Sequence, residues 1–256
     1  MKRLIGSLSA ILFVVFAAGV LFAGGQKEAV GPQVPTIKVA TDATWPPMEF
    51  VNTDKELVGF DVDLINAAAK AGGFKVTLQN TAWDGIFAGL ANGDYDAVIS
   101  SVTITDERKQ TMDFSMPYLN AGQVLVVRTD ESGVATLADL KGKSAGAQIG
   151  TTGAMEIQKV SGVALKTYDE IGLAVEDLAN GRIAGVVVDN PTAANYVLQN
   201  DNYKSRLKIV GKPFTEEYYG IAVKKGNTKV LDLINAGLKK VLSTSLPREL
   251  ESKWLR

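Results

Sequence analysis

The stretch LANG at residues 90–93, followed by AVI at 97–99, has a second copy later in the chain: LANG at 178–181, followed by GVV at 185–187. Each copy consists of a predicted helix end, a glycine stop and a short apolar strand. Such a joint is common in α/β proteins, so a short identity can arise by chance. We favour two similar α/β units over one continuous sheet, with the largest cleft between them, where the ends of the sheets face each other.

Outward from this pair, short strands alternate with segments of helical spacing. The predicted strands cover residues 37–41, 75–78, 97–100, 123–128, 144–148, 163–167, 185–188 and 219–223. The predicted helices cover residues 60–71, 86–91, 136–140, 151–160, 170–180, 191–199 and 230–242. This alternation predicts an α/β fold with mostly parallel sheets and right-handed crossovers.

The composition excludes several classes of function. The chain has 256 residues, of which 46% are apolar, and a net charge of −1, so no basic field exists and we expect no nucleic-acid partner. It has no cysteine, which excludes disulfides, thiolate metal sites and a lipid-modified cysteine. It has no histidine, which excludes a Ser-His-Asp triad and the usual zinc sites. We predict no metal and no cofactor.

The first 25 residues have the order of charged, apolar and small residues that is typical of a secretory signal peptide. Lys2 and Arg3 precede an uncharged stretch from Leu8 to Ala23. We expect this segment to be cleaved, and a retained membrane anchor is the alternative. Residues 26–35 contain two prolines and no apolar period, which predicts a flexible leader. The expected location is therefore the periplasm, without a cysteine-linked lipid.

Polar and aromatic side chains follow the predicted strands where each strand ends. In α/β folds, ligands collect at the carboxyl ends of strands. The candidates for ligand binding are Asp42, Trp45, Trp83, Ser100, Ser101, Thr103, Arg108, Thr152 and Asp189.

This set of side chains suits a small zwitterion. A guanidinium such as that of Arg108 matches a carboxylate with two parallel hydrogen bonds, and hydroxyls fill the remaining lone pairs. A buried ammonium needs an acid, for which Asp189 is the candidate. Trp45 and Trp83 can face the ligand side chain, and Asp42 beside them would hold a cationic one.

Each candidate also has an ordinary structural interpretation. Asp42 and the threonines can cap turns or helices, Trp83 can be core, and Arg108 can form a surface ion pair. The stretch GTTG at 150–153 lacks the lysine of a phosphate-binding loop, so we expect no nucleotide there. The coincidence at successive strand ends favours the ligand site.

The sequence also resembles a known family, the bacterial solute-binding proteins of ABC importers for polar and basic amino acids (extracellular solute-binding proteins, family 3). The resemblance runs from about Thr36 to Leu255. Its most specific strings are GFDVDL at 59–64 and TITDER at 103–108. Further matching strings are VATD at 39–42, PMEF at 47–50, WDG at 83–85, GDYDA at 93–97, DFSMPY at 113–118, DLKGK at 139–143, GTT at 150–152, YGIAV at 219–223 and KW at 253–254.

The resemblance implies a two-lobe periplasmic-binding-protein fold of type II. Each lobe is a mixed, mostly parallel sheet flanked by helices. Lobe 1 is expected near 36–120 and 220–256, and lobe 2 near 124–214. Two hinge strands near 120–123 and 215–219 would join them.

The resemblance also implies roles for the candidate residues. Arg108 grips the ligand carboxylate, with help from Ser101, Thr103 and Thr152. Asp189 takes the α-ammonium with Ser101 or Thr103. Asp42, Trp45 and Trp83 enclose the ligand side chain.

From these roles we expect binding of a free L-amino acid, a basic one (arginine or lysine), by hinge closure, and delivery to the permease of an ABC importer. We expect a monomer and no enzymatic activity. The alternatives are a protein that binds glutamine or another neutral polar amino acid, and an enzyme similar to the cyclohexadienyl dehydratases, with Asp42 or Glu49 as the acid.

Two departures from the family pattern bear on these expectations. Ala184-Gly185 replaces a usual Asp-Ala before a strand, which affects packing. Gly153 replaces a polar residue found in many relatives, which affects the ligand class.

Overall fold

The computed structural model describes residues 34–255. The expected signal peptide over residues 1–25, and all but the end of the leader, lie outside this range. The helices are α1 (Phe60–Gly72), α2 (Ile86–Asn92), α3 (Arg108–Thr111), α4 (Thr152–Gln158), α5 (Ile171–Ala179), α6 (Asn190–Ala194), α7 (Thr228–Leu242) and α8 (Leu246–Trp254), with a 3₁₀ turn η1 (Leu137–Leu140) and a π turn η2 (Asn195–Gln199). Among these described residues, no helix is long and apolar enough to cross a membrane.

The strands form two five-stranded mixed sheets and two small ones. The first large sheet has the order β5-β1-β6-β15-β7, and the second has the order β11-β10-β12-β9-β13. The strands of the first are β1 (Thr36–Thr41), β5 (Lys75–Asn80), β6 (Ala97–Val98), β7 (Met112–Phe114) and β15 (Ala222–Lys224). Those of the second are β9 (Gln123–Arg128), β10 (Ser144–Gln148), β11 (Ala164–Tyr168), β12 (Gly185–Asp189) and β13 (Leu207–Val210).

The two large sheets share one pairing pattern. In each, the first three strands are parallel, and the fourth and fifth join by antiparallel pairing. We call the first sheet with its helices lobe 1 and the second with its helices lobe 2. The expected α/β fold with two mixed sheets is thereby confirmed.

The internal repeat of the sequence falls at the same place in both sheets. Its two copies end in β6 and β12, each third in its sheet. Gly93 and Gly181, which follow the ends of α2 and α5, have φ of 86° and 73°. This left-handed backbone favours glycine, which explains why both copies carry it at the stop.

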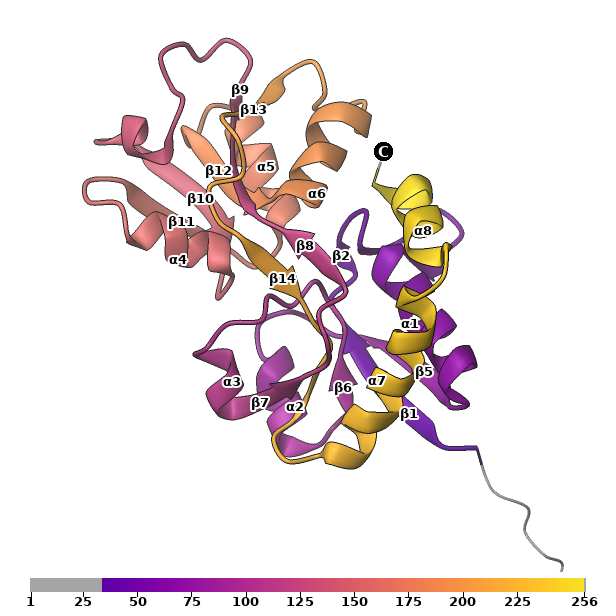
Figure 1. Cartoon of the computed structure of the whole chain (residues 1–256). Coiled ribbons are helices and arrows are strands. Elements are labelled where there is room, and N and C mark those ends of the chain that lie inside the picture. Colours follow the sequence, from indigo (N-terminus) through magenta and orange to yellow (C-terminus); the bar gives the residue numbers. More distant parts are fainter. Residues whose placement is uncertain (1–33, 256) are drawn as a thin grey trace, which may run out of the picture. The chain divides into compact units, whose positions relative to one another are not determined.

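The chain passes between the sheets along one short antiparallel ribbon. This ribbon pairs β8 (Leu119–Ala121), on the way to β9, with β14 (Glu217–Tyr219), on the way back to β15. Figure 1 shows both strands running between the two large sheets. Lobe 2 is therefore one continuous segment inserted into lobe 1.

Two predicted elements differ in the structure. The strand predicted over 219–223 is interrupted, so that β14 and β15 belong to different sheets. The break lies at Gly220, whose N–H donates to the carbonyl of Val102 and where a Cβ would lie 2.7 Å from Ile104 Cδ1. The helix predicted over 191–199 begins as α6 and changes to the π turn η2.

A small sheet in lobe 1 was not predicted. It joins β2 (Thr44–Trp45), β3 (Glu49–Val51) and β4 (Leu57–Val58) in that order. Its strands are too short to show alternation. The sheet matters because its first two strands carry Trp45 and Glu49.

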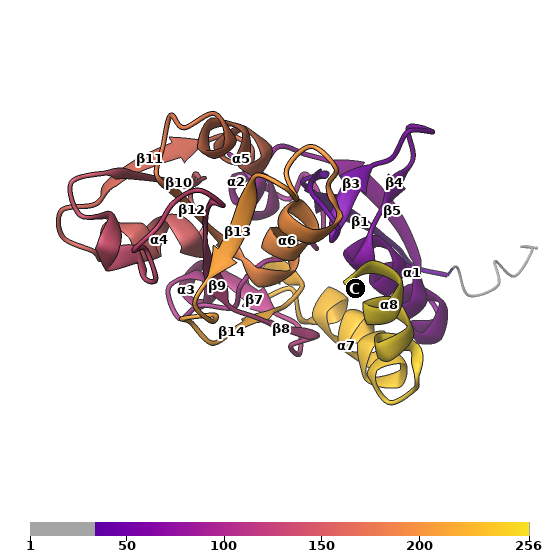
Figure 2. The same ribbon diagram turned by 90° about the horizontal axis from the view of Figure 1, so that it is seen from above.

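Helices from both ends of the described chain pack together in lobe 1. α7 and α8 lie beside α1 in both Figure 1 and Figure 2. A Cβ at Gly237 of α7 would lie 2.2 Å from the Ala68 carbonyl oxygen of α1. Glycine therefore allows this close approach of the two helix backbones.

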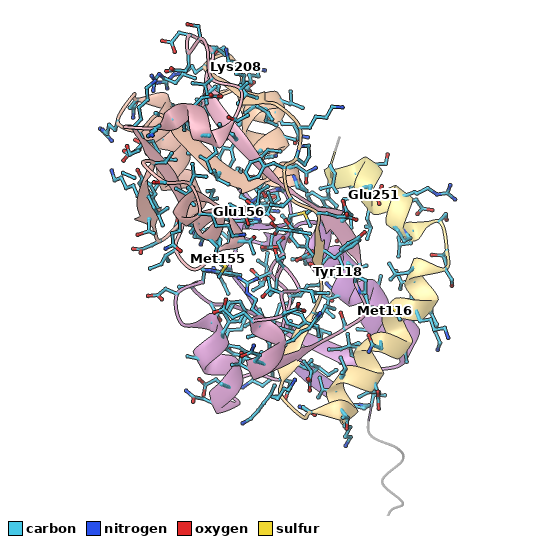
Figure 3. All side chains as sticks on the ribbon, turned by 60° about the vertical axis from the view of Figure 1, so that its left-hand side comes forward. Met116, Tyr118, Met155, Glu156, Lys208 and Glu251 are labelled. Atoms are coloured by element: carbon cyan, nitrogen blue, oxygen red, sulfur yellow. The ribbon has the colours of Figure 1, made fainter. Side chains whose placement is uncertain are left out.

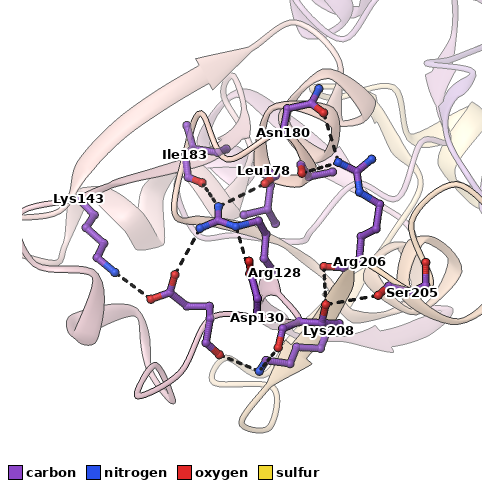
Figure 4. Close-up of polar contacts among 12 residues, drawn as sticks. Arg128, Asp130, Lys143, Leu178, Asn180, Ile183, Ser205, Arg206 and Lys208 are labelled. Atoms are coloured by element: carbon purple, nitrogen blue, oxygen red, sulfur yellow. Dashed lines mark hydrogen bonds and ion pairs between the residues drawn. The ribbon is translucent and has the colours of Figure 1, made fainter.

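Two arginines secure the end of α5 in lobe 2 (Figure 4). Arg128 Nη1 donates to the carbonyls of Leu178 (3.4 Å) and Ile183 (3.1 Å), and Arg206 Nη2 donates to that of Ala179 (2.6 Å). Positive charge at a helix C-terminus is favourable because it meets unpaired carbonyls. These contacts fix the joint that leads into β12.

Candidate functional site

One cavity is lined by residues of both lobes. Its lining includes every side chain that the sequence analysis selected, and three that it did not commit to: Glu49, Gln148 and Thr151. The roles of these residues stay predictions. Their convergence in one cavity follows from the topology, because the carboxyl ends of β1, β6, β10 and β12 meet there.

Arg108 begins α3 and is 8% exposed. Its guanidinium carbon lies 5.6 Å from the ring centre of Trp83 and 5.2 Å from that of Phe87, so aromatic faces orient it. Nη1 donates to the Thr103 carbonyl (2.9 Å). Burial lowers the pKa of Arg108, whereas the negative charge of Asp189 raises it.

Asp189 ends β12 and is 5% exposed. Its Oδ1 accepts no hydrogen bond of ordinary geometry from the described residues, although Tyr219 and Gln123 lie close enough to lower its pKa. Burial, with the nearby charge of Glu217, raises the pKa of Asp189 to about 7. A buried carboxyl in this state gains from a cation that enters the cavity.

Two hydrogen bonds connect the lobes around the cavity. Arg108 Nη2 of lobe 1 donates to the Gly150 carbonyl of lobe 2 (3.1 Å). Gln148 Nε2, at the end of β10, donates to Asp42 Oδ2, just after β1 (3.0 Å). Arg108, Gln148 and Asp42 all line the cavity, so the lobes meet through groups that line it.

Asp42 and the two tryptophans line the cavity together. Asp42 also accepts a hydrogen bond from Thr44 Oγ1 (2.9 Å), and burial raises its pKa. The indole N–H of Trp45 has no partner among the described residues. Trp83 packs edge-to-face on Phe87, with ring centres 5.0 Å apart, and so serves the core and the cavity at once.

The two serines after β6 are held by buried acids of lobe 1. Ser100 Oγ donates to Glu49 Oε1 (3.1 Å) and accepts from the Asp42 N–H (3.0 Å). The Ser101 N–H donates to Asp61 Oδ2 (2.8 Å), which holds Ser101 at its positive φ of 49°.

Burial acts on both of these acids. It raises the pKa of Glu49 well above its usual value, to which the charge of Asp61 adds, and raises that of Asp61 to about 6. Tyr118, labelled in Figure 3, donates to Asp61 Oδ2 (2.8 Å). The serine segment therefore rests on a polar network that is internal to lobe 1.

The threonine hydroxyls meet a carboxyl group that the sequence analysis missed. Thr103 Oγ1 of lobe 1 and Thr152 Oγ1 of lobe 2 both donate to Glu217 Oε2, at 3.0 and 2.7 Å. Gln123 Nε2 donates to the same oxygen (3.3 Å) and to Thr152 Oγ1 (3.0 Å). Glu217 is 9% exposed.

The missed residues differ in what the sequence could have revealed. Gln148 is the last residue of β10, so the strand-end rule covers it. Glu217 is the first residue of β14, in the ribbon that crosses between the lobes, so the rule for carboxyl ends of strands does not cover it. Its place at the site follows from tertiary structure alone.

Glycine at 153 has a steric cause. A Cβ there would lie 2.8 Å from the Val187 carbonyl oxygen and 2.9 Å from Gln123 Oε1. No side chain fits without a shift of β12. The departure from the family pattern at this position therefore comes with close packing of α4 on the strand that carries Asp189.

Comparison with known proteins gives consistent matches. Residues 37–256 match the model of the bacterial extracellular solute-binding proteins, family 3. A probable histidine-binding protein of Neisseria gonorrhoeae is 38% identical over 239 residues, which cover 90% of this chain and 88% of that protein.

Solved structures agree with this match. An ancestral arginine-binding protein, bound to arginine, is 42% identical with a TM-score of 0.81 over 86% of this chain and 98% of its own. An ancestral arginine-binding protein bound to glutamine is 43% identical with a TM-score of 0.81, over 87% of this chain and 98% of its own. An ancestral amino acid-binding protein, a precursor of cyclohexadienyl dehydratase, is 34% identical with a TM-score of 0.79, over 86% and 96%. The chain therefore belongs to the bacterial extracellular solute-binding proteins, family 3.

Proposed function

We propose that this protein binds a free L-amino acid with a basic side chain outside the cytoplasm and delivers it to the permease of an ABC importer. One observation carries the proposal. A buried guanidinium, Arg108, and a buried carboxyl with an unpartnered oxygen, Asp189, line the same cavity from opposite lobes. A zwitterion offers each of them a partner.

The two charges of an α-amino acid match this arrangement. The α-carboxylate would take guanidinium N–H groups of Arg108 other than the two that donate to the Thr103 and Gly150 carbonyls. The α-ammonium would take Asp189, whose ionised form it stabilises. Both pairings are needed together, because an unpaired charge buried in the cavity costs several kcal/mol.

Closure of the lobes couples binding to recognition by the permease. Arg108 belongs to lobe 1, while Asp189 and Thr152 belong to lobe 2. A ligand that contacts both lobes stabilises the form in which they meet. Bending would occur in the β8–β14 ribbon, the proposed hinge, which joins lobe 1 near 36–120 and 220–256 to lobe 2 near 124–214.

The basic side chain is proposed from Asp42. This buried acid lines the cavity together with Trp45 and Trp83, whose faces favour a cation. Among the described lining residues, the single cation is Arg108, so nothing else would attract an acidic side chain. The bound arginine in the ancestral relative supports the same class.

Glutamine is the second candidate ligand. An ancestral arginine-binding protein that is 43% identical to this chain has a structure with glutamine bound, which supports this alternative. Asp42 would then accept a hydrogen bond from the ligand amide instead of pairing with a charge.

An enzymatic role is not proposed. The relatives reported above are binding proteins, and the relative connected with cyclohexadienyl dehydratase is itself an amino acid-binding protein. A prephenate-like substrate would bring two carboxylates to a cavity whose described lining holds a single cation.

Thermal-shift measurements with the twenty amino acids, followed by calorimetry, test the proposal. We expect arginine or lysine to give the largest stabilisation, since a ligand that binds only the folded state raises the melting temperature. Stabilisation by glutamine alone would replace the basic class with the neutral one. If no amino acid stabilises the protein, the proposed function is wrong.

A further inference from the structure

Glu217 lies behind the cavity, at the point where three parts of the molecule meet. Its Oε2 accepts from Thr103 of lobe 1, from Thr152 of lobe 2 and from Gln123 at the start of β9. Its Oε1 accepts from Thr215 Oγ1 (2.7 Å). Each of these four hydrogen-bond partners is a donor to the carboxyl group.

The two threonines are left as acceptors. A hydroxyl group has one proton and two lone pairs. The protons of Thr103 and Thr152 are both directed at Glu217, although both side chains line the cavity. Neither hydroxyl has a proton left for a ligand carboxylate. What Thr103 offers the cavity is lone pairs, which match an ammonium group.

The acceptor count differs between the two threonines. Thr152 Oγ1 already accepts from Gln123 Nε2, so one of its lone pairs is used. Thr103 Oγ1 lies 3.5 Å from Thr152 Oγ1, too far for more than a weak contact. Thr103 is therefore the better acceptor, and Asp189 with its unpartnered Oδ1 lines the same cavity.

We infer that Glu217 is a positioning residue, which binds no ligand itself but directs the hydroxyl protons of Thr103 and Thr152 away from the cavity, so that their lone pairs receive the α-ammonium. This inference rests on the proposed function. A purely structural role, in which Glu217 only holds the lobes together, would change the affinity for every ligand by the same factor.

The experiment compares two ligands that differ in the ammonium alone. Each amino acid that binds the wild-type protein is paired with the molecule that carries hydrogen in place of the α-ammonium: 5-guanidinopentanoate for arginine, 6-aminohexanoate for lysine and 4-carbamoylbutanoate for glutamine. Affinities are measured by calorimetry, with competition for weak ligands. The variants are Glu217→Met, which removes the acceptor, and Glu217→Gln, whose amide oxygen still accepts a hydroxyl proton.

A neighbouring residue supplies the control. Glu216 is exposed and accepts from Tyr218 Oη (2.9 Å). The variant Glu216→Met removes the same charge from the same strand region without touching the threonines, so we expect unchanged affinity.

The expected result is a loss of discrimination. In Glu217→Met the affinity for the amino acid falls by about tenfold or more, the loss typical of a hydrogen bond to a charged group, while that for the analogue without an ammonium changes by less than about threefold. In Glu217→Gln the ratio of the affinity for the amino acid to that for the analogue stays close to the wild-type ratio. Equal losses for both ligands, or unchanged discrimination in Glu217→Met, would overturn the inference.

A double-mutant cycle gives a second test that needs no analogue. If Glu217 acts through the hydroxyl of Thr103, then Glu217→Met in a Thr103→Val background costs much less affinity than it does alone. Additive effects would contradict the inference and leave the proposed function intact. If the wild-type protein binds no amino acid, the inference falls together with the proposed function.

Discussion

The ends of β6 and β12 share a backbone frame but differ in how their polar groups are satisfied. After β6, Ser100 and Ser101 are bonded to Glu49 and Asp61 within lobe 1. At the end of β12, Asp189 keeps an unpartnered oxygen in the cavity. Each strand end therefore keeps one buried oxygen without a partner, a neutral hydroxyl at Ser101 in lobe 1 and a carboxyl oxygen at Asp189 in lobe 2, and the two differ in the charge that they offer a ligand. The two copies of the repeat therefore share their backbone structure, and the side chains that follow each copy determine what it can bind.

The strongest test removes the charge that lobe 1 does bring to the cavity. Arg108→Ala should lower the affinity for the amino acid by at least about 30-fold, since the loss of one partner from a buried charge pair costs about 2–5 kcal/mol. Calorimetry measures the effect. The exposed neighbour Lys109 provides the control variant Lys109→Ala, which should bind normally. Near-native affinity in Arg108→Ala would end the assignment of Arg108 as the anchor.

The second test uses pH, because Asp189 and the serine segment should respond differently. With the pKa of Asp189 raised to about 7, the carboxyl group is mostly neutral at pH 5 and must lose a proton to pair with an ammonium. Affinity should therefore rise with pH through 7. Well below pH 7, each further decrease of one pH unit should lower the affinity by about tenfold, because one proton must leave Asp189 for each ligand bound.

A variant identifies the origin of this pH dependence. The charge of Glu217 contributes to the raised pKa of Asp189, so Glu217→Gln should move the midpoint of the affinity profile to lower pH. A profile that is flat from pH 5 to 8 in the wild-type protein would show that Asp189 does not pair with the ligand.

The third test changes the acid at the other strand end of lobe 1. Asp42→Asn should weaken the binding of arginine or lysine by about tenfold and that of glutamine by less, because an amide can still accept a hydrogen bond but cannot pair with a charge. Calorimetry with all three ligands gives the ratios. An equal loss for the three would argue against contact between Asp42 and the ligand side chain.

The smallest expected effect lies at Ser100. Its hydroxyl joins Glu49 to the Asp42 backbone, so Ser100→Ala should cost about 1–3 kcal/mol of stability, as expected when a buried acceptor loses its donor. Affinity should change by less than about threefold, the level of an indirect contact. Chemical denaturation and calorimetry separate the two. A large loss of affinity with unchanged stability would mean that lobe 1 also reserves this hydroxyl for the ligand.

The fold could be predicted from the sequence where local pattern and topology agree. The repeated glycine stops predicted two similar units, and the residues after successive strands predicted a shared site for Arg108 and Asp189, which line one cavity. Features with a tertiary cause could not be predicted. The interruption at Gly220 accompanies the hydrogen bond from its N–H to the Val102 carbonyl, which no local period reveals. Glu217 reaches the site because the crossing ribbon passes behind it.

The insertion of lobe 2 also sets an order of assembly. β15 fills the gap between β6 and β7, yet it follows every strand of lobe 2 along the chain. As the polypeptide emerges from its N-terminus, lobe 2 has all its strands by Val210, while the first sheet still lacks its fourth member. The first sheet can therefore be completed only after every strand of lobe 2 has emerged, unlike domains arranged one after another, of which the N-terminal one can fold first.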